Sequence, residues 1–541
     1  MAAPDSDSYL PFASCDEPRL DRLAWRLILV GSLVRLLYAA LYPMNLAGDE
    51  AYYWQWGQHL DWGYFSKPPG IAWLMALVTT LGGDHTVTIR LTSAVIGVGS
   101  LLLVRLLARH LFDARAAVLA VLITLATPAN VLLNLMLTID APLVFCWSAA
   151  LWCLWQWVHD EKKAGLWLAG LSLALAGGYL SKQMMLIFPL LAIIWLATSP
   201  LHRARLKSPG FWTAIAISLI ALLPPLWWNS QHDWVTFHHT GGQLAGDTDN
   251  RPFGYTFVEY LATQAGVLSP VIFFFVIATA VIGLKHFRKL GDAERFLIMF
   301  SAPAIGVMFL MSLRQTMLPN WAAVYYIAAL LLVAAWLAGS TTASLSLPAR
   351  WRRATRPALI IGFVMVAVGY LWAPALEALG YSGHPKLDPM RRLRGHQVSA
   401  EALAPFLEKV PRPDQTFIVA QDHRYNASQL GFYLPGQPEI YRWERYDQIA
   451  SQYELWPNPV DDGKVGWDAL VIMPNADKKI PLRFQGAFES FELIGTLDVP
   501  VSPHYERHFR LFLGKSLKEW PQGMAVPGTT EEPAEAPDSD S

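Results

Sequence analysis

Eleven apolar segments constrain this chain more than any other feature of its sequence, because each is long enough to cross a bilayer as a helix. They lie at about 24–43, 86–108, 115–130, 140–158, 164–181, 183–199, 211–228, 258–284, 293–312, 320–338 and 357–373. Of the 541 residues 53% are hydrophobic and only 16% are charged, which is too few charges for an ordinary soluble protein. The sequence therefore predicts a polytopic α-helical membrane protein with about 11 transmembrane helices.

Charge and the N-terminal residues exclude two further classes. The formal net charge of -1 leaves no basic excess to neutralise a nucleic-acid backbone, so no nucleic-acid partner is expected. Residues 1–23 are polar and acidic and lack the basic start and cleavage site of a signal peptide. We expect them to form a cytoplasmic tail before a transmembrane domain at 24–373.

The loops between the apolar segments differ in their positive charge, and this difference predicts the orientation. With the N-terminus in the cytoplasm, most loop Lys and Arg residues lie inside. The outer loops then contain only Lys67, Arg90, Lys182, Arg251 and Arg314. Such a bias predicts a multi-pass membrane protein with a cytoplasmic N-terminus. Because cations are rare outside, Lys182 and Arg314 suggest an anionic ligand.

The composition changes at about residue 374, where apolar runs shorten to the length of strands. The runs lie at 416–420, 468–473, 491–497 and 509–514, with helical patterns near 399–409 and 424–433. We expect a soluble α/β domain of mixed strand order at 374–523. An odd number of spans would place it in the periplasm. Residues 524–541 are acidic and contain proline, which predicts a disordered tail.

The first outer loop, Gly48 to Gly70, is polar and aromatic, and we expect it to begin two outer-loop helices at 48–82. A helix opening at Asp49 and Glu50 would place Tyr53, Trp56 and Leu60 on one face, suited to the headgroup region. Asp49 has two interpretations. It is either an N-cap of this helix or a general base beside a phosphate-binding cation.

Other charged residues of the outer side also have two interpretations each. Asp140 is either the N-cap of the fourth span or one carboxylate of an interior site. Lys182 either snorkels to the surface or contacts a phosphate. Arg314 either anchors a helix end or binds a phosphate in bidentate fashion.

Three further residues are less informative. His232 and Asp233 form a dipeptide that could hold a metal, but the usual number of ligands is not evident from the spacing. Arg35 lies within the first span and needs a partner there, for which we expect a carboxylate in a structural ion pair.

Several motifs, in order and spacing, resemble glycosyltransferase family 39. They are GDEAYYW with YFSKPPG in the first outer loop, TIDAPLVFCW, GGYLSKQ, WWNSQHDW, LPNW and the later YELWP. The resemblance covers most of residues 24–340. Members of this family include bacterial relatives of the protein O-mannosyltransferases and of the aminoarabinose transferase that modifies lipid A. The resemblance implies the GT-C fold and a polyprenyl-phosphate-linked sugar as donor.

The resemblance also implies roles for individual residues. Asp49 matches the acidic residue of the first outer loop that acts as the base or positions the acceptor, Asp140 matches a second acidic position, and Glu50 is a weaker catalytic match. Lys67, Lys182 and Arg314 match cations around the donor phosphate. Candidate substrate contacts are Tyr52, Tyr53, His232 and Asp233. The loop reads FSKPPG where lipid A transferases have Glu before Lys, so lipid A does not follow as the acceptor.

The expected activity is an inverting transfer of a sugar from the lipid-linked donor to a hydroxyl or phosphate acceptor on the periplasmic face. The expected acceptor is a cell-envelope glycolipid or polysaccharide, with a protein O-glycosyltransferase as an alternative. The chemistry requires no cofactor, although a divalent metal would be compatible with it. A transporter or flippase is the other class, but the sequence has no internal repeat and its candidates lie at one surface. The sugar, the acceptor, the oligomeric state and the role of the C-terminal domain do not follow from the sequence.

Overall fold

The computed structural model describes residues 15–42, 44–245, 252, 254–345, 349–474 and 479–524. The chain forms two compact units, one of Met1–Pro43 with Trp56–Ala375 and one of Met44–Gln55 with Leu376–Ser541. The second unit thus begins close to the composition change at 374. It also takes in residues 44–55, because the backbone of Leu46 donates to the Tyr433 hydroxyl and accepts from the Gln429 amide. The two units are described separately below.

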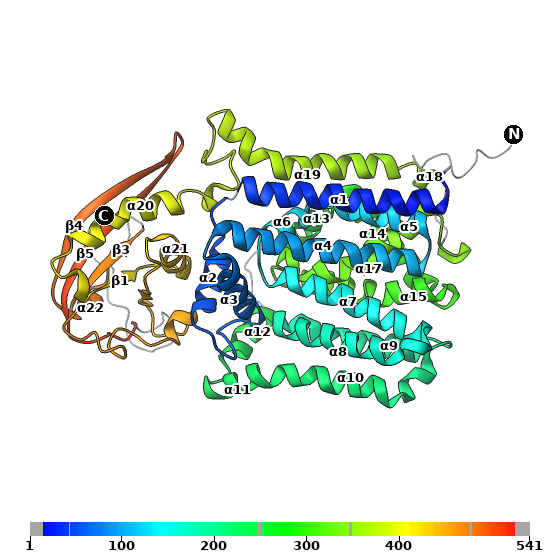
Figure 1. Ribbon diagram of the computed structural model, residues 1–541, viewed down its shortest axis with the longest axis horizontal. Helices are drawn as coiled ribbons and strands as arrows, with labels where there is room; N and C mark the ends of the chain where they lie inside the picture. Colours follow the sequence, from blue (N-terminus) through cyan, green and yellow to red (C-terminus); the bar gives the residue numbers. More distant parts are fainter. Residues whose placement is uncertain are drawn as a thin grey trace. The chain divides into compact units, whose positions relative to one another are not determined.

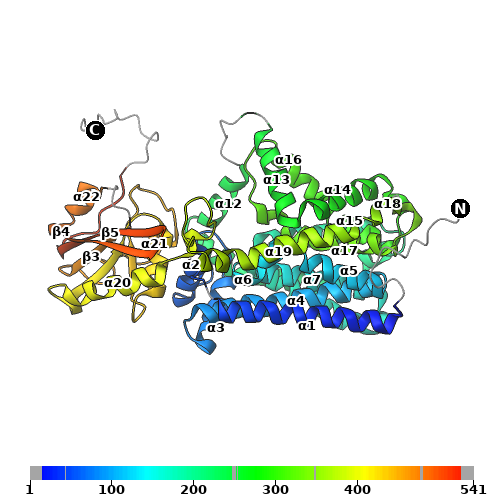
Figure 2. The ribbon, with the colours of Figure 1, turned by 90° about the horizontal axis from the view of Figure 1, so that it is seen from above.

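Eight apolar helical segments of the described residues are long enough to cross a membrane. In both views the long helices of this unit lie side by side (Figures 1 and 2). The segments are Glu17–Leu41 (α1), Thr86–Leu111 (α4), Asp140–His159 (α7), Glu161–Ser181 (η1 and α8), Pro209–Gln231 (α10, η4 and α11), Asp292–Met311 (α15 and α16), Pro319–Ala338 (η6 and α17) and Thr355–Ala378 (α19).

Two further segments are broken helices. Ala114–Leu125 (α5) and Ala129–Leu135 (α6) meet at 75°, and Tyr255–Leu268 (α13) and Pro270–Lys285 (α14) meet at 110°. Pro128 and Pro270 lie at these breaks, as expected of residues that begin a helix but cannot continue one. The predicted span 183–199 forms the shorter apolar helix Gln183–Thr198 (η2 and α9). The described residues therefore contain eight to ten candidate spans, and the prediction of about eleven differs by that short segment.

Burial divides the spans into central and peripheral helices. The apolar window of α17 is 94% buried within the protein, whereas those of α1 and α19 are 28% and 22% buried. A helix that is apolar on all sides and fully buried forms the centre of a bundle. The other two leave most of their apolar surface for lipid.

Arg35 of α1 is buried, and its predicted carboxylate partner is wrong. The guanidinium interacts with the hydroxyl of Tyr370 on α19 instead. A phenol adds no second charge, so this contact ties α1 to α19 without an ion pair among the described residues.

Two short helices follow the first span as predicted, Gly48–Gln58 (α2) and Gly70–Gly82 (α3). The predicted membrane-facing stripe is wrong, because Tyr53 and Trp56 are buried in protein and Leu60 lies beyond the end of α2. The loop between α11 and α13 contains a helix, Val235–Ala245 (α12). Residues 246–251 and 253 of that loop lie outside the described residues.

The C-terminal unit contains the predicted sheet of mixed strand direction. Its five strands, in the order β2-β1-β3-β5-β4, are Ile440–Arg442 (β2), Thr416–Ala420 (β1), Asp468–Met473 (β3), Tyr505–Leu517 (β5) and Phe488–Ser502 (β4). Strands β2, β1 and β3 are parallel, and β5 pairs antiparallel with β3 and β4. The helices are His396–Lys409 (α20), Arg424–Tyr433 (α21) and Leu482–Gln485 (α22). Strand β2 is the one that the sequence did not predict.

Candidate active site

Asp140, Lys182 and Asn320 form a cluster in the helical unit, in which Asp140 and Lys182 are buried and Asn320 is exposed. The Lys182 Nζ atom lies 2.8 Å from Asp140 Oδ1, and the Asn320 Nδ2 atom lies 2.6 Å from Asp140 Oδ2. Both charged side chains are at most 9% exposed. Asp140 is the first residue of α7, and its N-cap is Ile139 without a side-chain bond. The interpretations of Asp140 as an N-cap and of Lys182 as a snorkelling lysine are therefore both wrong.

The ends of three elements meet in this cluster. Asp140 begins α7, Lys182 follows the last residue of α8, and Asn320 lies in η6 (Pro319–Ala322) before α17. Each of these three residues lies where a helix starts or stops. Its polar side chain therefore reaches the cluster without interrupting an apolar span. Burying the Asp140 carboxylate or the Lys182 ammonium without the other would be costly. Their ion pair therefore holds the ends of α7 and α8 together, and the hydrogen bond from Asn320 adds the start of α17.

The loop with Lys67 approaches the same end of α8. A side chain at Gly70, the first residue of α3, would lie 2.5 Å from the carbonyl oxygen of Leu180. Only glycine permits that contact. Lys67 lies three residues before Gly70 and is half-buried, and Leu180 lies two residues before Lys182. The structure thus brings the SKPPG motif next to the SKQ motif.

Residues in and just after the WWNSQHDW motif bind the part of the same loop that precedes Lys67. The Trp228 indole donates to Asp61 Oδ2 at 2.6 Å, and the Thr236 hydroxyl donates to the Tyr64 carbonyl oxygen at 2.8 Å. His232 stacks on the ring of Trp228 with centroids 3.9 Å apart. His232 therefore packs behind the loop.

Asp233 and Arg314 are not part of these contacts. Asp233 is exposed in the left-handed backbone region, with φ of 49°. Arg314 is exposed in the turn after α16 (Ala302–Met311). The described residues contain one cluster of potential metal ligands, and neither His232 nor Asp233 belongs to it.

Asp49 and Glu50 lie in the other unit, where they have different roles. The Glu50 carboxylate accepts a hydrogen bond from the Ala47 amide at 2.8 Å and so supplies the capping contact of α2. Asp49 instead accepts a hydrogen bond of 2.7 Å from the hydroxyl of Tyr425. The Tyr425 ring packs on Gly48, where any side chain would overlap it. The capping role proposed for Asp49 therefore belongs to Glu50.

Tyr425 belongs to α21 and was missed by the sequence reasoning. Burial and the negative charge of Asp49 raise the pKa of Tyr425 to about 12, so it remains a neutral donor at physiological pH. The preceding residues, Gln421 to Arg424, follow strand β1 at the carboxyl end of the parallel strands. Ligands bind at this edge in α/β sheets, and that rule applied to QDHRY could have found the segment.

Tyr52 and Tyr53 extend this cluster. The two rings stack at 6.5 Å, and Tyr52 also stacks at 6.0 Å on Tyr453 of the YELWP motif. The Arg424 guanidinium lies 5.4 Å from the centroid of the Tyr52 ring and 4.9 Å from that of Tyr425. A cation over two aromatic rings is held in place by its attraction to both of them.

Glu454 of the same motif supports the loop after β1. It pairs with Arg442, which also pairs with Glu444 and donates to the carbonyl oxygen of Asp422 at 2.9 Å. The two carboxylates raise the pKa of Arg442 although its burial opposes this. Asp422 has a φ of 76°, which costs energy for a residue with a side chain. The Arg442 contact holds it in that conformation.

The candidate residues thus form one group in each unit. Asp140, Lys182 and the Lys67 loop belong to the helical unit, and Asp49 and the tyrosines belong to the C-terminal unit. Asn320 was missed as an individual residue, although the LPNW motif contains it.

Comparisons with known proteins find relatives of this chain. Residues 66–228 match the family model described as dolichyl-phosphate-mannose-protein mannosyltransferase. Lipid A galacturonosyltransferase RgtD from Rhizobium johnstonii is 31% identical over 291 residues, which are 53% of this chain and 60% of that protein. The match therefore spans less than two thirds of the relative's length.

Two solved structures of ArnT from Cupriavidus metallidurans have the same fold. The apo structure aligns with a TM-score of 0.57 over 91% of this chain and 98% of that chain, at 16% identity. The structure bound to undecaprenyl phosphate aligns with a TM-score of 0.55 over 90% and 97%, also at 16% identity. These findings confirm the resemblance drawn from the motifs: the chain is a multi-pass membrane protein of the GT-C fold, similar in sequence to the mannosyltransferase family model over residues 66–228 and to the lipid A galacturonosyltransferase RgtD.

Proposed function

We propose that this protein is an inverting glycosyltransferase that takes a sugar from a polyprenyl-phosphate-linked donor. The acceptor is a hydroxyl or phosphate group of a cell-envelope glycolipid or polysaccharide on the periplasmic face of the inner membrane. In this proposal the N-terminus is cytoplasmic and the C-terminal unit is periplasmic.

The observation that carries the proposal is the buried Lys182 ammonium. An ammonium has three N–H donors. Asp140 binds one of them, so among the described residues two remain for the oxygens of a phosphate. Because Asp140 and Asn320 hold the group in place, little reorganisation is needed when charge develops on the leaving phosphate. Lys67 and Arg314 add positive charge in the same role.

Asp49 is the proposed base. The acceptor oxygen attacks the anomeric carbon, the bond from that carbon to the phosphate oxygen breaks, and polyprenyl phosphate leaves with the bonding pair. Asp49 accepts the proton of an acceptor hydroxyl. Tyr425 binds one carboxylate oxygen and orients the other toward the acceptor. Glu50 acts through the start of α2, and Tyr52 and Tyr53 line the acceptor side.

The names of the relatives support the classes of donor and acceptor. The RgtD relative is a lipid A galacturonosyltransferase, and ArnT, a structural neighbour, has been crystallised with undecaprenyl phosphate. Lipid A is therefore the first acceptor to test, with galacturonic acid among the first sugars. The matching family model is named for transfer to protein, so a peptide is the second acceptor.

Turnover of a panel of undecaprenyl-phosphate sugars by the purified full chain in liposomes tests the proposal. We expect one donor to be consumed with lipid A present. Asp49→Asn and Lys182→Ala should each lower turnover by roughly 10²–10⁴-fold, the usual range for losing a proton acceptor or a charge-stabilising donor.

Lys163→Ala is the matched control, since Lys163 is an exposed lysine between α7 and α8. Its turnover should equal that of the wild type. If no donor is consumed with any acceptor, the transferase proposal fails, and full activity of a folded Asp49→Asn protein would remove Asp49 as the base.

A further inference from the structure

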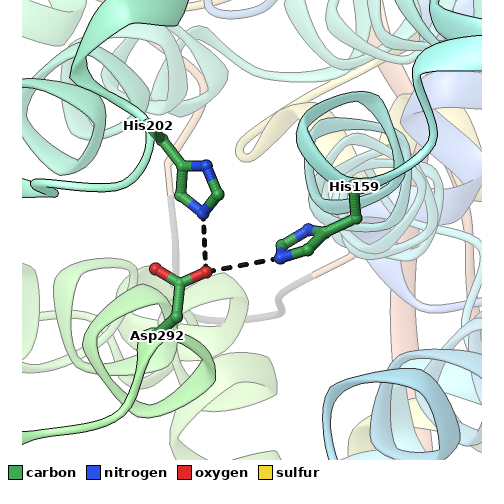
Figure 3. A group of neighbouring side chains, drawn as sticks. All are labelled: His159, His202 and Asp292. Atoms are coloured by element: carbon green, nitrogen blue, oxygen red, sulfur yellow. Dashed lines mark hydrogen bonds and ion pairs between the residues drawn. The ribbon is translucent and has the colours of Figure 1, made fainter.

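His159, His202 and Asp292 come together in the helical unit from three separate elements (Figure 3). His159 is the last residue of α7, His202 lies between α9 (Ile187–Thr198) and η3 (Arg203–Lys207), and Asp292 is the first residue of α15 (Asp292–Met299). Asp292 Oδ2 lies 2.7 Å from His202 Nε2 and 3.4 Å from His159 Nε2. All three ligand atoms lie within 4.8 Å of one another.

This cluster is remote from the candidate active site. Helix α7 begins at Asp140 and ends at His159. At 1.5 Å per residue the two positions are about 28 Å apart along the helix axis. The cluster is therefore not part of the Lys182 site, and it is independent of the proposed transfer reaction.

The orientation of the His159 ring is that of a metal ligand. Its Nδ1 atom lies 2.9 Å from the carbonyl oxygen of Trp155, which only accepts, so Nδ1 carries a proton. In a neutral ring Nε2 then has a lone pair, and this lone pair faces an oxygen of Asp292. Two acceptors face each other without attraction, so either a proton or a metal cation must lie between them. A backbone bond to the second nitrogen is the usual support of a metal-bound histidine.

Among the described residues, Asp292 has no structural role apart from its contacts with His159 and His202. The capping contact of α15 comes from Glu294, which accepts from the Gly291 amide at 2.8 Å. The second oxygen of Asp292 is buried without a hydrogen-bond partner. The neighbouring cation Arg205 is paired with Glu161 and stacks on Trp157. A buried carboxylate oxygen without a partner is costly unless a ligand occupies it.

We propose that His159, His202 and Asp292 bind a divalent transition metal, and their two nitrogens and one oxygen favour Zn²⁺. Three protein ligands with a water as the fourth are a common zinc set. Bonds of about 2.0–2.1 Å in a tetrahedron place neighbouring ligand atoms roughly 3.3 Å apart. The His159 distance of 3.4 Å already fits, and the His202 distance of 2.7 Å must lengthen by about half an ångström. The ion would join the end of α7, the turn before η3 and the start of α15.

Titration of the chelator-treated full chain in detergent with Zn²⁺ alone, and with Co²⁺ as a spectroscopic substitute, tests the site. We expect one equivalent of metal and the visible absorption of four-coordinate Co²⁺. Asp292→Asn and His202→Gln should each weaken binding by at least about 100-fold, because even the outer partners of such ligands are worth 10–100-fold.

His286→Gln is the matched control. His286 also bonds through Nδ1 to a carbonyl four residues earlier, but it has no part in the cluster. It should bind Zn²⁺ as the wild type does.

If the wild type binds Zn²⁺ no better than Asp292→Asn and His202→Gln do, the cluster is an imidazolium–carboxylate network and the proposal fails. Because the His159 side chain is 39% exposed, His159→Gln is the variant least disturbing to the fold. If the Asp292→Asn and His202→Gln proteins do not fold, the Zn²⁺ affinity of His159→Gln tests the proposal in their place.

Discussion

The two groups of candidate residues hold their carboxylates in different ways. In the helical unit, Asp140 is bound by the ammonium of Lys182 and by an amide. In the C-terminal unit, Asp49 is bound by the neutral phenol of Tyr425. The first carboxylate is paired with a cation, whereas the second accepts a hydrogen bond from a neutral donor. The difference suggests a division of labour in which Asp140 positions a cation and Asp49 receives a proton.

Breaking the first pair should have the largest effect on stability. Asp140→Asn leaves the Lys182 ammonium buried without a counter-charge, and we expect the free energy of unfolding to fall by about 3–5 kcal/mol. Thermal melting of the full chain in detergent would measure this loss. Asp160→Asn is the matched control, because Asp160 follows the other end of α7 and accepts only a hydrogen bond from Trp167 at 3.1 Å.

Replacing both partners separates stability from function. Asp140→Leu combined with Lys182→Met should restore stability to within about 1 kcal/mol, since apolar groups replace a buried ion pair at little cost. Activity should not return, because the phosphate-binding cation is gone. Recovery of activity in the double variant would show that the pair is only structural.

The second group should differ from the first in its response to acid. Burial, and to a lesser extent the charge of Arg507, lower the pKa of His396 to about 3. The His396 backbone donates to the Asn45 side chain at 2.9 Å, and so anchors the segment that leads to Asp49. An unfolded histidine has a pKa near 6.5, so below this pH only the unfolded state gains the proton. Stability is therefore complete above about pH 6.5 and decreases as the pH falls, by about 2 kcal/mol at pH 5.

Hydrogen exchange of α20 in the full chain, corrected for the intrinsic rate at each pH, would measure this change. His396→Gln should abolish the difference between pH 7.5 and pH 5, whereas His508→Gln, at an exposed pair with Asp498, should retain it. If acid instead loosens the ends of α7 and α8 first, the contrast between the two groups is wrong.

The sequence predicted those features that depend on local pattern. Long apolar segments located the membrane helices, and short apolar runs located four of the five strands. The sequence left Asp140 open between a cap and an interior carboxylate, because cap preferences are local, whereas Lys182 and Asn320 are brought to it by tertiary packing. The three-residue strand β2 is too short to carry a pattern of its own.

No pattern in the sequence indicates which residues contact one another in these clusters. Tyr425 is 376 residues from Asp49, and Asp292 is 90 residues from His202, so neither spacing resembles a known motif. His202 and Asp292 also lie beside the basic residues whose presence was explained by membrane topology. Basic residues that membrane topology explains therefore do not indicate that a histidine–aspartate cluster lies beside them.

The smallest expected effect is that of Tyr425→Phe, and it tests whether the phenol positions Asp49. Loss of one hydrogen bond to a carboxylate is worth about 1.5 kcal/mol, or roughly tenfold in turnover. If Tyr425 only orients the base, kcat should fall by that factor while KM for the lipid donor stays the same. Tyr441→Phe removes a phenol that bonds the carboxylates of Glu439, at 2.8 Å, and Asp462, at 2.5 Å, neither of which lies in α2, and should change neither constant. A rise in KM with kcat unchanged would mean that Tyr425 contacts a substrate, and Asp49 would then be held in place by other means.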